Sequence, residues 1–508
     1  MTITKGVLDA SLDPRKKNRD CEFRKWQQRT CKHDSIAPLL THTMTLQEWL
    51  EKNGAKGLDH LVLEEFPETG RGIKTLRALK AGDEILTIPG AVLWTVDAAN
   101  TDPLLGPILR SLDPPLSVEE TLAVFLLFIK ARDTGYEERK LHTEVLPTHY
   151  TASIFFDDDE LEVCAGSSLY GVTKQLKQQI KSEYMITLDR LFVKHPEVFP
   201  LHKFTLEEYS WALCTIWSRA MDFKLPEKQF RLIAPFADML NHSLGVKTCH
   251  VYDQRTGVLR VLADNDYKAR DQRVFLANCI SLIPSTGSVF KVFINYGPVP
   301  NNRLLRLYGF VLPNNPHDSY ELVLTTHHLA PFYDQKVALF IAAKLDVNST
   351  FSLTLTEPLP DKVLQYLRIQ RSTSQELTTI LATANAASKP VTARNEAEIL
   401  TALDEALENL LAGFAVSIEE LELRVAGDQY PVGGNAWAAA HVSMGEQRIL
   451  RLALAATRDR QVLVVCARCG KAEDGNKKCG RCKKVVYCSV DCQKAHHKEH
   501  KGSCKSPQ

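Results

Sequence analysis

Eight residues that commonly bind zinc stand in four pairs near the end of the sequence, with two or three residues inside each pair: Cys466, Cys469, Cys479, Cys482, Cys488, Cys492, His500 and Cys504. Zinc takes four thiolate or imidazole ligands in a tetrahedron, and such short gaps let both members of a pair reach one ion. The eight ligands therefore predict two closed zinc sites, which leave no open position for water and are structural. His496 and His497 lie nearby, but the three-residue step to Cys504 selects His500.

The segment that holds these ligands is also basic, with ten Lys and Arg against four Asp and Glu. Seven thiolates and two zinc ions contribute −3, which leaves the segment at about +3. We interpret the basic side chains as a partial offset of the sulfur charge that helps to keep the thiols deprotonated. Nucleic acid is the alternative partner. A disulfide framework is disfavoured, because nothing marks the chain as secreted.

The whole pattern, residues 466–504, resembles the MYND zinc finger. The resemblance implies that the first and third pairs hold one ion through Cys466, Cys469, Cys488 and Cys492. It implies that the second and fourth pairs hold the other ion through Cys479, Cys482, His500 and Cys504. MYND fingers usually bind proline-containing peptides of partner proteins, so a docking role is implied and no chemistry of its own.

Four short motifs lie further towards the N-terminus: Gly70-Arg71-Gly72, Asp238-Met239-Leu240-Asn241-His242, Ile294-Asn295-Tyr296-Gly297 and Tyr308-Gly309-Phe310. Each is weak alone, because a glycine pair is more often just a turn and a buried Asn-His pair is more often a satisfied polar network. Together, and in this order, they are informative.

The elements that must position these motifs follow from periodicity. Short strands are predicted at 59–66, 84–89 and 92–95, and helices follow, with capping boxes at Ser117-x-x-Glu120 and Thr205-x-x-Glu208. Strands return at 249–253, 258–263, 291–295 and 320–325. Beyond about residue 335 the pattern is helical, with a third capping box at Ser417-x-x-Glu420. The order β, long α, β, α predicts an α+β fold in which helices interrupt a β unit.

The stretch YGPVPNNRLLRLYGF, residues 296–310, resembles the C-terminal half of a SET domain. The run 43–325 resembles the branch related to the plant Rubisco large-subunit methyltransferases. The resemblance implies a SET β-fold split by a helical insertion, about 101–235, and an all-α substrate-binding domain at 326–460. In better-known SET–MYND proteins the MYND finger interrupts the SET domain, whereas in this sequence the finger follows the SET domain and the helical domain. We therefore expect the finger to lie outside the cofactor site.

The resemblance implies in-line methyl transfer from S-adenosylmethionine to a protein amine, which needs positioning and exclusion of water. Tyr296 corresponds to the catalytic tyrosine, and Tyr308 would line a lysine channel. Arg219 would meet the methionine carboxylate of the cofactor, and Phe310 would pack against the adenine. The full implied cofactor set is Gly70, Arg71, Gly72, Arg219, Asp238, Asn241, His242, Tyr296 and Phe310.

We therefore expect a protein-lysine N-methyltransferase that acts on a non-histone protein. A histidine-directed methyltransferase is one alternative, since such a variant exists in this branch, although the Tyr296/Tyr308 pair suits a lysine channel. An inactive SET–MYND adaptor is the other alternative, and intact Tyr296 and Arg219 argue against it. The substrate, the number of methyl groups added, the finger's partner and the oligomeric state do not follow from the sequence.

Two features depart from the family pattern. Residues 273–291 precede the strand that bears Tyr296, and without them the sequence would read DYKARDQVFINYG. They are either a surface loop or a translated intron, and their apolar character and clean rejoining favour the intron. Arg303 stands where acidic side chains are common in the family.

Bulk composition narrows the class of protein. The 508 residues are 44% hydrophobic and 24% charged, as in ordinary globular proteins, and the net charge of +1 gives no overall attraction to nucleic acid or anionic membranes. No apolar run reaches the ~20 residues that span a bilayer. The polar, non-periodic pattern of residues 1–42 predicts a loosely ordered tail and contains no signal sequence. The basic run at 15–19 within this tail is either a solvated charge cluster or a nuclear-import patch. Six scattered cysteines indicate a reducing compartment, so we expect the cytosol or the nucleus.

Overall fold

The computed structural model describes residues 44–505 except 67–69, 225–228, 244–246, 248–249, 267–289, 295–296 and 384–386. The tail predicted at 1–42 lies outside the described residues. So does the unusual stretch 273–291, apart from Phe290 and Lys291 at its end. A first helix, α2 (Leu46–Lys52), precedes the strands. In the described part of the chain, no helix is long and apolar enough to cross a bilayer.

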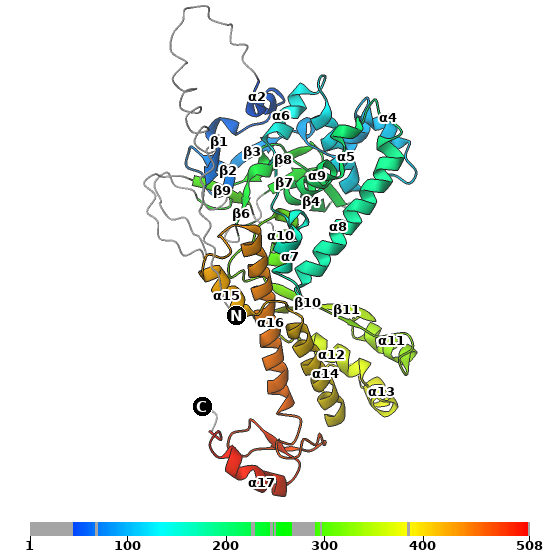
Figure 1. Ribbon diagram of the computed structural model, residues 1–508, viewed down its shortest axis with the longest axis vertical. Coiled ribbons are helices and arrows are strands. Elements are labelled where there is room, and N and C mark those ends of the chain that lie inside the picture. Colours follow the sequence, from blue (N-terminus) through cyan, green and yellow to red (C-terminus); the bar gives the residue numbers. More distant parts are fainter. Residues whose placement is uncertain are drawn as a thin grey trace, which may run out of the picture. The chain divides into compact units, whose positions relative to one another are not determined.

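A four-stranded sheet brings distant parts of the chain together (Figure 1). Its order is β1 (Leu61–Phe66), β2 (Gly70–Thr75), β9 (Phe290–Ile294) and β6 (Asn241–His242). The first three strands pair antiparallel, and β6 runs parallel to β9. β9 is thus an inner strand, with residues from far earlier in the chain on both sides.

The other strands of this region form a three-stranded antiparallel sheet and a hairpin. The sheet has the order β3 (Glu84–Ile88), β8 (Val258–Leu262) and β7 (His250–Asp253), and the hairpin joins β4 (Met221–Lys224) to β5 (Gln229–Leu232). The strand predicted at 92–95 is wrong. A 3-10 turn at Gly90–Val92 and a single bridge between Trp94 and Ile233 replace it, because Pro89 and Gly90 begin a turn there.

Helices fill the chain between β3 and β4: α3 (Val96–Thr101), α4 (Leu105–Arg110), α5 (Val118–Ala131), α6 (Glu137–Val145), α7 (Asp158–Glu162), α8 (Ser168–Thr187) and α9 (Leu206–Arg219). α5 is buried all round over residues 121–129, which places it in the core. Its predicted capping box is confirmed, since Ser117 and Glu120 exchange both hydrogen bonds.

In each of the other two predicted capping boxes, only one of the two hydrogen bonds forms. Thr205 accepts the Glu208 N–H, but the Glu208 carboxylate pairs with Lys130 of α5 at 2.5 Å. Ser417 accepts the Glu420 N–H, and the Glu420 carboxylate binds Arg424 instead. In each case a lysine or arginine competes for the carboxylate.

The second part of the chain is mainly helical. After α10 (Asn301–Tyr308) it contains α11 (Tyr333–Ala342), α12 (Asp361–Gln370), α13 (Ser374–Leu381), α14 (Ala393–Ala412), α15 (Ile418–Ala426) and α16 (Asn435–Gln461). The long helix α16 packs along α14 (Figure 1). The region predicted as helical also holds a strand, β11 (Asn348–Thr354), which pairs with β10 (Ser319–Thr325).

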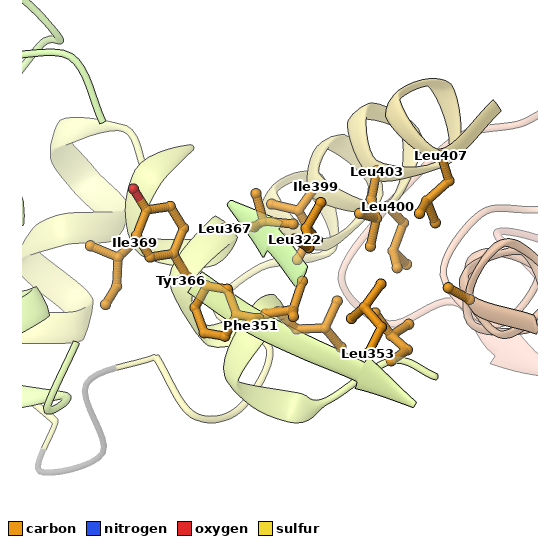
Figure 2. Close-up of a cluster of buried hydrophobic side chains, with 14 of the residues drawn as sticks. Leu322, Phe351, Leu353, Tyr366, Leu367, Ile369, Ile399, Leu400, Leu403 and Leu407 are labelled. Carbon is orange, nitrogen blue, oxygen red and sulfur yellow. The ribbon is translucent and has the colours of Figure 1, made fainter. Parts of the chain in front are cut away.

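Figure 2 shows why β11 forms. Phe351 and Leu353 point from β11 into a buried cluster, together with Leu322 of β10, against Tyr366 and Leu367 of α12 and a row of α14 side chains, Ile399, Leu400, Leu403 and Leu407. Buried and exposed side chains alternate along β11, as a half-buried strand requires. The alternation is hard to recognise in the sequence because its polar positions are Ser and Thr.

The C-terminal segment is a small module of two short strands, β12 (Lys477–Lys478) and β13 (Val486–Tyr487), and one helix, α17 (Val490–His500). Its core consists of cysteines and Tyr487. Such a core contains too little apolar surface to hold a fold alone, so metal binding has to stabilise it.

Candidate functional site

Two of the sequence motifs meet at the C-terminal end of β9. On one side, Ile73 of β2 pairs with Val292, so Gly70-Arg71-Gly72 continue alongside the last residues of β9. On the other side, Asn241 and His242 of β6 pair with Phe293 and Ile294. β9 ends at Ile294, two residues before Tyr296, which lies outside the described residues. The predicted motifs therefore converge on the strand end that leads to the predicted catalytic tyrosine.

The turn before Asn241 is strained. Phe236 is fully buried and has φ +72°, a backbone conformation that bulky L-residues rarely adopt. The short 3-10 turn Ala237–Met239 follows and buries Asp238. Strain of this kind persists only where the surroundings impose it.

Asp238 is the centre of a buried charged network. Its Oδ2 lies 3.2 Å from Nη1 of Arg219 and 3.2 Å from Nε2 of His142. Arg219 also donates from Nη1 to the Asp238 carbonyl oxygen at 3.0 Å and from Nε to the Tyr150 hydroxyl at 3.4 Å. Burial by itself raises the pKa of Asp238, but His142 and Arg219 hold that pKa below its ordinary value. The network therefore presents Arg219 in one fixed orientation.

His142 and Tyr150 were not predicted as site residues. His142 is fully buried on α6, beside Trp94 with 5.7 Å between the ring centres. Tyr150 bonds Thr215 of α9 at 2.9 Å. A lone histidine on a helix gives no signal in the sequence, because its partner Asp238 stands 96 residues further along.

Tyr308 and Phe310 flank the C-terminal end of α10. Gly309 ends the helix with φ +78°, and a Cβ there would lie 2.6 Å from Thr151 Oγ1 and 2.9 Å from the Ala152 nitrogen, so only glycine fits. The two rings lie 6.3 Å apart. Burial raises the pKa of Tyr308 above its ordinary value, so its hydroxyl stays protonated at neutral pH.

The eight predicted zinc ligands form two clusters. Within each, the ligand atoms lie within 4.8 Å of one another: Cys466, Cys469, Cys488 and Cys492 in the first, and Cys479, Cys482, His500 and Cys504 in the second. A tetrahedron with Zn–S bonds of about 2.3 Å places sulfur atoms about 3.8 Å apart. The Sγ–Sγ distances are 3.5 Å for Cys469–Cys488, 3.6 Å for Cys488–Cys492 and 3.8 Å for Cys479–Cys504. Both clusters fit zinc, and their pairing is the one the resemblance implied.

Backbone amides support the sulfur charge in this module. The N–H groups of Cys482 and Arg481 lower the pKa of the Cys479 thiol to about 6. A thiolate is the form that binds metal, so the fold itself prepares this ligand.

Comparison with known proteins matches two parts of the chain to known domains. Residues 327–450 match the family model described as Rubisco LSMT substrate-binding, and residues 466–504 match the MYND finger. The chain is 25% identical over 414 residues to the ribulose-1,5-bisphosphate carboxylase/oxygenase large subunit N-methyltransferase of Nicotiana tabacum, with 80% of each chain covered. The crystal structure of the SET domain of LSMT bound to lysine and AdoHcy has a TM-score of 0.69 at 22% identity, over 84% of this chain and 92% of that one.

The chain carries a Rubisco LSMT-type substrate-binding domain and a MYND finger, and its fold is that of the SET domain of LSMT. The predicted SET fold, the substrate-binding domain and the MYND finger are confirmed. A second relative, the actin-histidine N-methyltransferase of Mus musculus, is 26% identical over 425 residues, covering 80% of this chain and 67% of the relative. The relatives thus include enzymes named for lysine and enzymes named for histidine as the acceptor.

The predicted cofactor site has features that fit S-adenosylmethionine. Among the described residues, Asp238 Oδ1 and Arg71 Nε are buried polar atoms without a hydrogen-bond partner. Gly70 is exposed at the start of β2 with φ +65°, and a Cβ there would meet nothing within 4 Å. Buried polar atoms without a partner, one of them on the residue next to an open glycine, are what a polar ligand requires. The individual cofactor contacts, including those of Asn241, His242 and Phe310, stay predictions.

Proposed function

We propose that this protein methylates a lysine side chain of a non-histone protein. The observation that carries the proposal is the convergence of Gly70-Arg71-Gly72 and Asn241-His242 on the strand end that precedes Tyr296. The half-buried ring of Tyr308 supports an apolar channel for the acceptor. The relatives that methylate lysine, among them the fructose-bisphosphate aldolase-lysine N-methyltransferase of Arabidopsis thaliana at 25% identity over 440 residues, support the same reaction class.

In the proposed mechanism, S-adenosylmethionine supplies a methyl group on a sulfonium. The acceptor nitrogen forms the new N–C bond as the S–C bond breaks, and it loses one proton to solvent. Arg219, held by Asp238, orients the charged end of the cofactor, which fixes the direction of attack. Tyr308 stays a neutral phenol and accepts or donates a hydrogen bond at the amine, in a channel whose low polarity favours the unprotonated lysine.

Histidine is the second candidate acceptor, because curated relatives of similar identity are actin-histidine methyltransferases. The two acceptors differ in chemistry, since imidazole is mostly neutral at pH 7 whereas lysine must first lose a proton. Lysine methylation therefore rises steeply with pH up to about pH 10, and histidine methylation levels off above about pH 7.

The decisive experiment incubates the protein with isotope-labelled S-adenosylmethionine and cell extract. Labelled bands identify substrates, and fragmentation mass spectrometry places the methyl group on lysine or histidine. We expect Tyr296→Phe to abolish labelling, whereas Tyr333→Phe, on α11, leaves it unchanged. If calorimetry detects no cofactor binding, the protein is an adaptor and the proposal fails.

We also propose that the MYND finger docks proline-containing segments of partner proteins, and that the protein works in the cytosol or the nucleus. The family match and the closed zinc sites support the docking role. A proline-rich peptide array, read with and without chelator, tests the docking. Fluorescence imaging of the tagged chain tests the location.

A further inference from the structure

The two zinc knuckles of the finger share one backbone turn but differ in one residue. In the first, the Gly470 N–H donates to the Cys466 carbonyl at 2.8 Å, and in the second, the Lys483 N–H donates to the Cys479 carbonyl at 3.0 Å. Both residues have positive φ, +72° for Gly470 and +56° for Lys483. Glycine adopts this conformation without strain and lysine does not. Folding alone therefore favours glycine at position 483, yet the second knuckle carries lysine.

Lys483 is one of five basic residues around the second knuckle, which we call the basic knuckle: Lys477, Lys478, Arg481, Lys483 and Lys484. All five are exposed. Among the described residues none of the five has an ion pair. No acidic residue stands between Asp474 and Asp491 in the sequence. The basic knuckle therefore presents a concentrated positive charge to its surroundings.

The charge of the zinc sites does not account for this concentration. The first site, with four thiolates around Zn²⁺, carries about −2, and the second, with three thiolates and a neutral histidine, carries about −1. Compensation would place the excess of cations at the first site. There, however, Arg468 lies 3.6 Å from Glu499 and Lys471 lies 3.9 Å from Glu473, so its cations already have partners. The excess of unpaired basic residues lies at the second zinc site, which is the less negative of the two.

We propose that the basic knuckle binds an acidic stretch of a partner protein. The negative charge of carboxylates complements the five exposed cations of the basic knuckle. Contact with such carboxylates would also explain why lysine, rather than glycine, occupies the strained position 483. Single-stranded nucleic acid is less favoured, because base stacking needs exposed aromatic rings. In the described finger the only such ring besides histidine is Tyr487, which is 3% exposed and bonds His496. This surface shares no residue with the predicted methyl-transfer site, so the proposal stands independently of the proposed function.

The test uses the full-length zinc-loaded protein and fluorescence anisotropy with a labelled peptide of eight glutamates. We expect binding that weakens with salt, and no binding of an eight-glutamine peptide. Lys483→Gly relieves the backbone strain, so zinc content and thermal stability stay the same or rise, while affinity for the acidic peptide falls about two- to five-fold. Lys494→Gln, a basic residue of α17 outside the knuckle, is the matched control and leaves affinity unchanged.

The triple variant Lys477→Gln, Arg481→Gln, Lys484→Gln extends the test, with an expected loss of about ten-fold or more. Unchanged affinity in both this variant and Lys483→Gly overturns the proposal, as does equal binding of the glutamine peptide. Tighter binding of a 20-base-pair DNA duplex than of the acidic peptide also overturns it and assigns the surface to nucleic acid.

Discussion

Replacing Asp238 by asparagine tests whether a buried charge holds the predicted cofactor arginine in place. The Asp238 side chain is fully buried, and so is that of His142, while the side chain of Arg219 is 15% exposed. Asparagine keeps the shape but removes the charge, which leaves the Arg219 guanidinium without its carboxylate. Breaking a buried ion pair on one side costs about 3–5 kcal/mol. Because Arg219 keeps its bond to the Asp238 carbonyl oxygen, we expect the lower end, about 3 kcal/mol.

The free energy of unfolding is measured by urea titration with tryptophan fluorescence, since Trp94 lies beside His142. Asp222→Asn is the matched control, because Asp222 pairs with Arg231 at 2.8 Å but its side chain is 43% exposed, and it should cost less than about 1 kcal/mol. The folded-state pKa of Asp238 is lowered, so its stabilisation is present above the unfolded-state pKa and is lost as the pH falls through the folded-state value. The difference between wild type and Asp238→Asn should therefore shrink in acid. Equal costs for Asp238→Asn and Asp222→Asn at pH 7 would refute the reasoning.

Two further predictions concern the finger and two buried carboxyl groups: Asp318, which accepts a hydrogen bond from the Asn301 N–H, and Glu446, which accepts one from the Ser168 N–H. Cys488→Ser should remove one of the two zinc ions and abolish partner binding by the finger while leaving cofactor affinity nearly intact; metal analysis and calorimetry check this, and lost cofactor affinity would contradict it. Burial raises the pKa of Glu446 to about 7 and that of Asp318 to about 6, so the folded state binds protons that the unfolded state releases. The stability of the fold should therefore fall as the pH rises from about 4.5 to 7. In thermal unfolding scans, Glu446→Gln should reduce the slope of stability against pH. An unchanged slope would exclude Glu446 as its source.

The parts that the sequence predicts best are those whose partners are close in the chain. The zinc ligand sets follow from spacings of two or three residues and from the family pattern, and both clusters form. The cap of α5 is equally local. By contrast, the role of His142 depends on Asp238, and the full cap of α9 is lost because Lys130, far away in sequence, takes the Glu208 carboxylate. The family resemblance implied that Gly70-Arg71-Gly72, Asn241-His242 and Tyr296 serve one cofactor site, and the strand register shows that the first two motifs lie at the same end of β9.

The double pairing of β9 has an evolutionary consequence. β9 pairs in register with Ile73 on one side and with Asn241-His242 on the other. These two registers determine where the C-terminal end of β9 lies, whatever the number of residues that precede the strand. In the sequence, 29 residues separate Leu262 from Val292, and 10 would remain without residues 273–291. The difference in loop-closure entropy is only about 1 kcal/mol. A gene that gained or lost this stretch would encode the same register at Val292–Ile294. Selection for an intact active site would therefore act only weakly on changes in the length of the chain before β9.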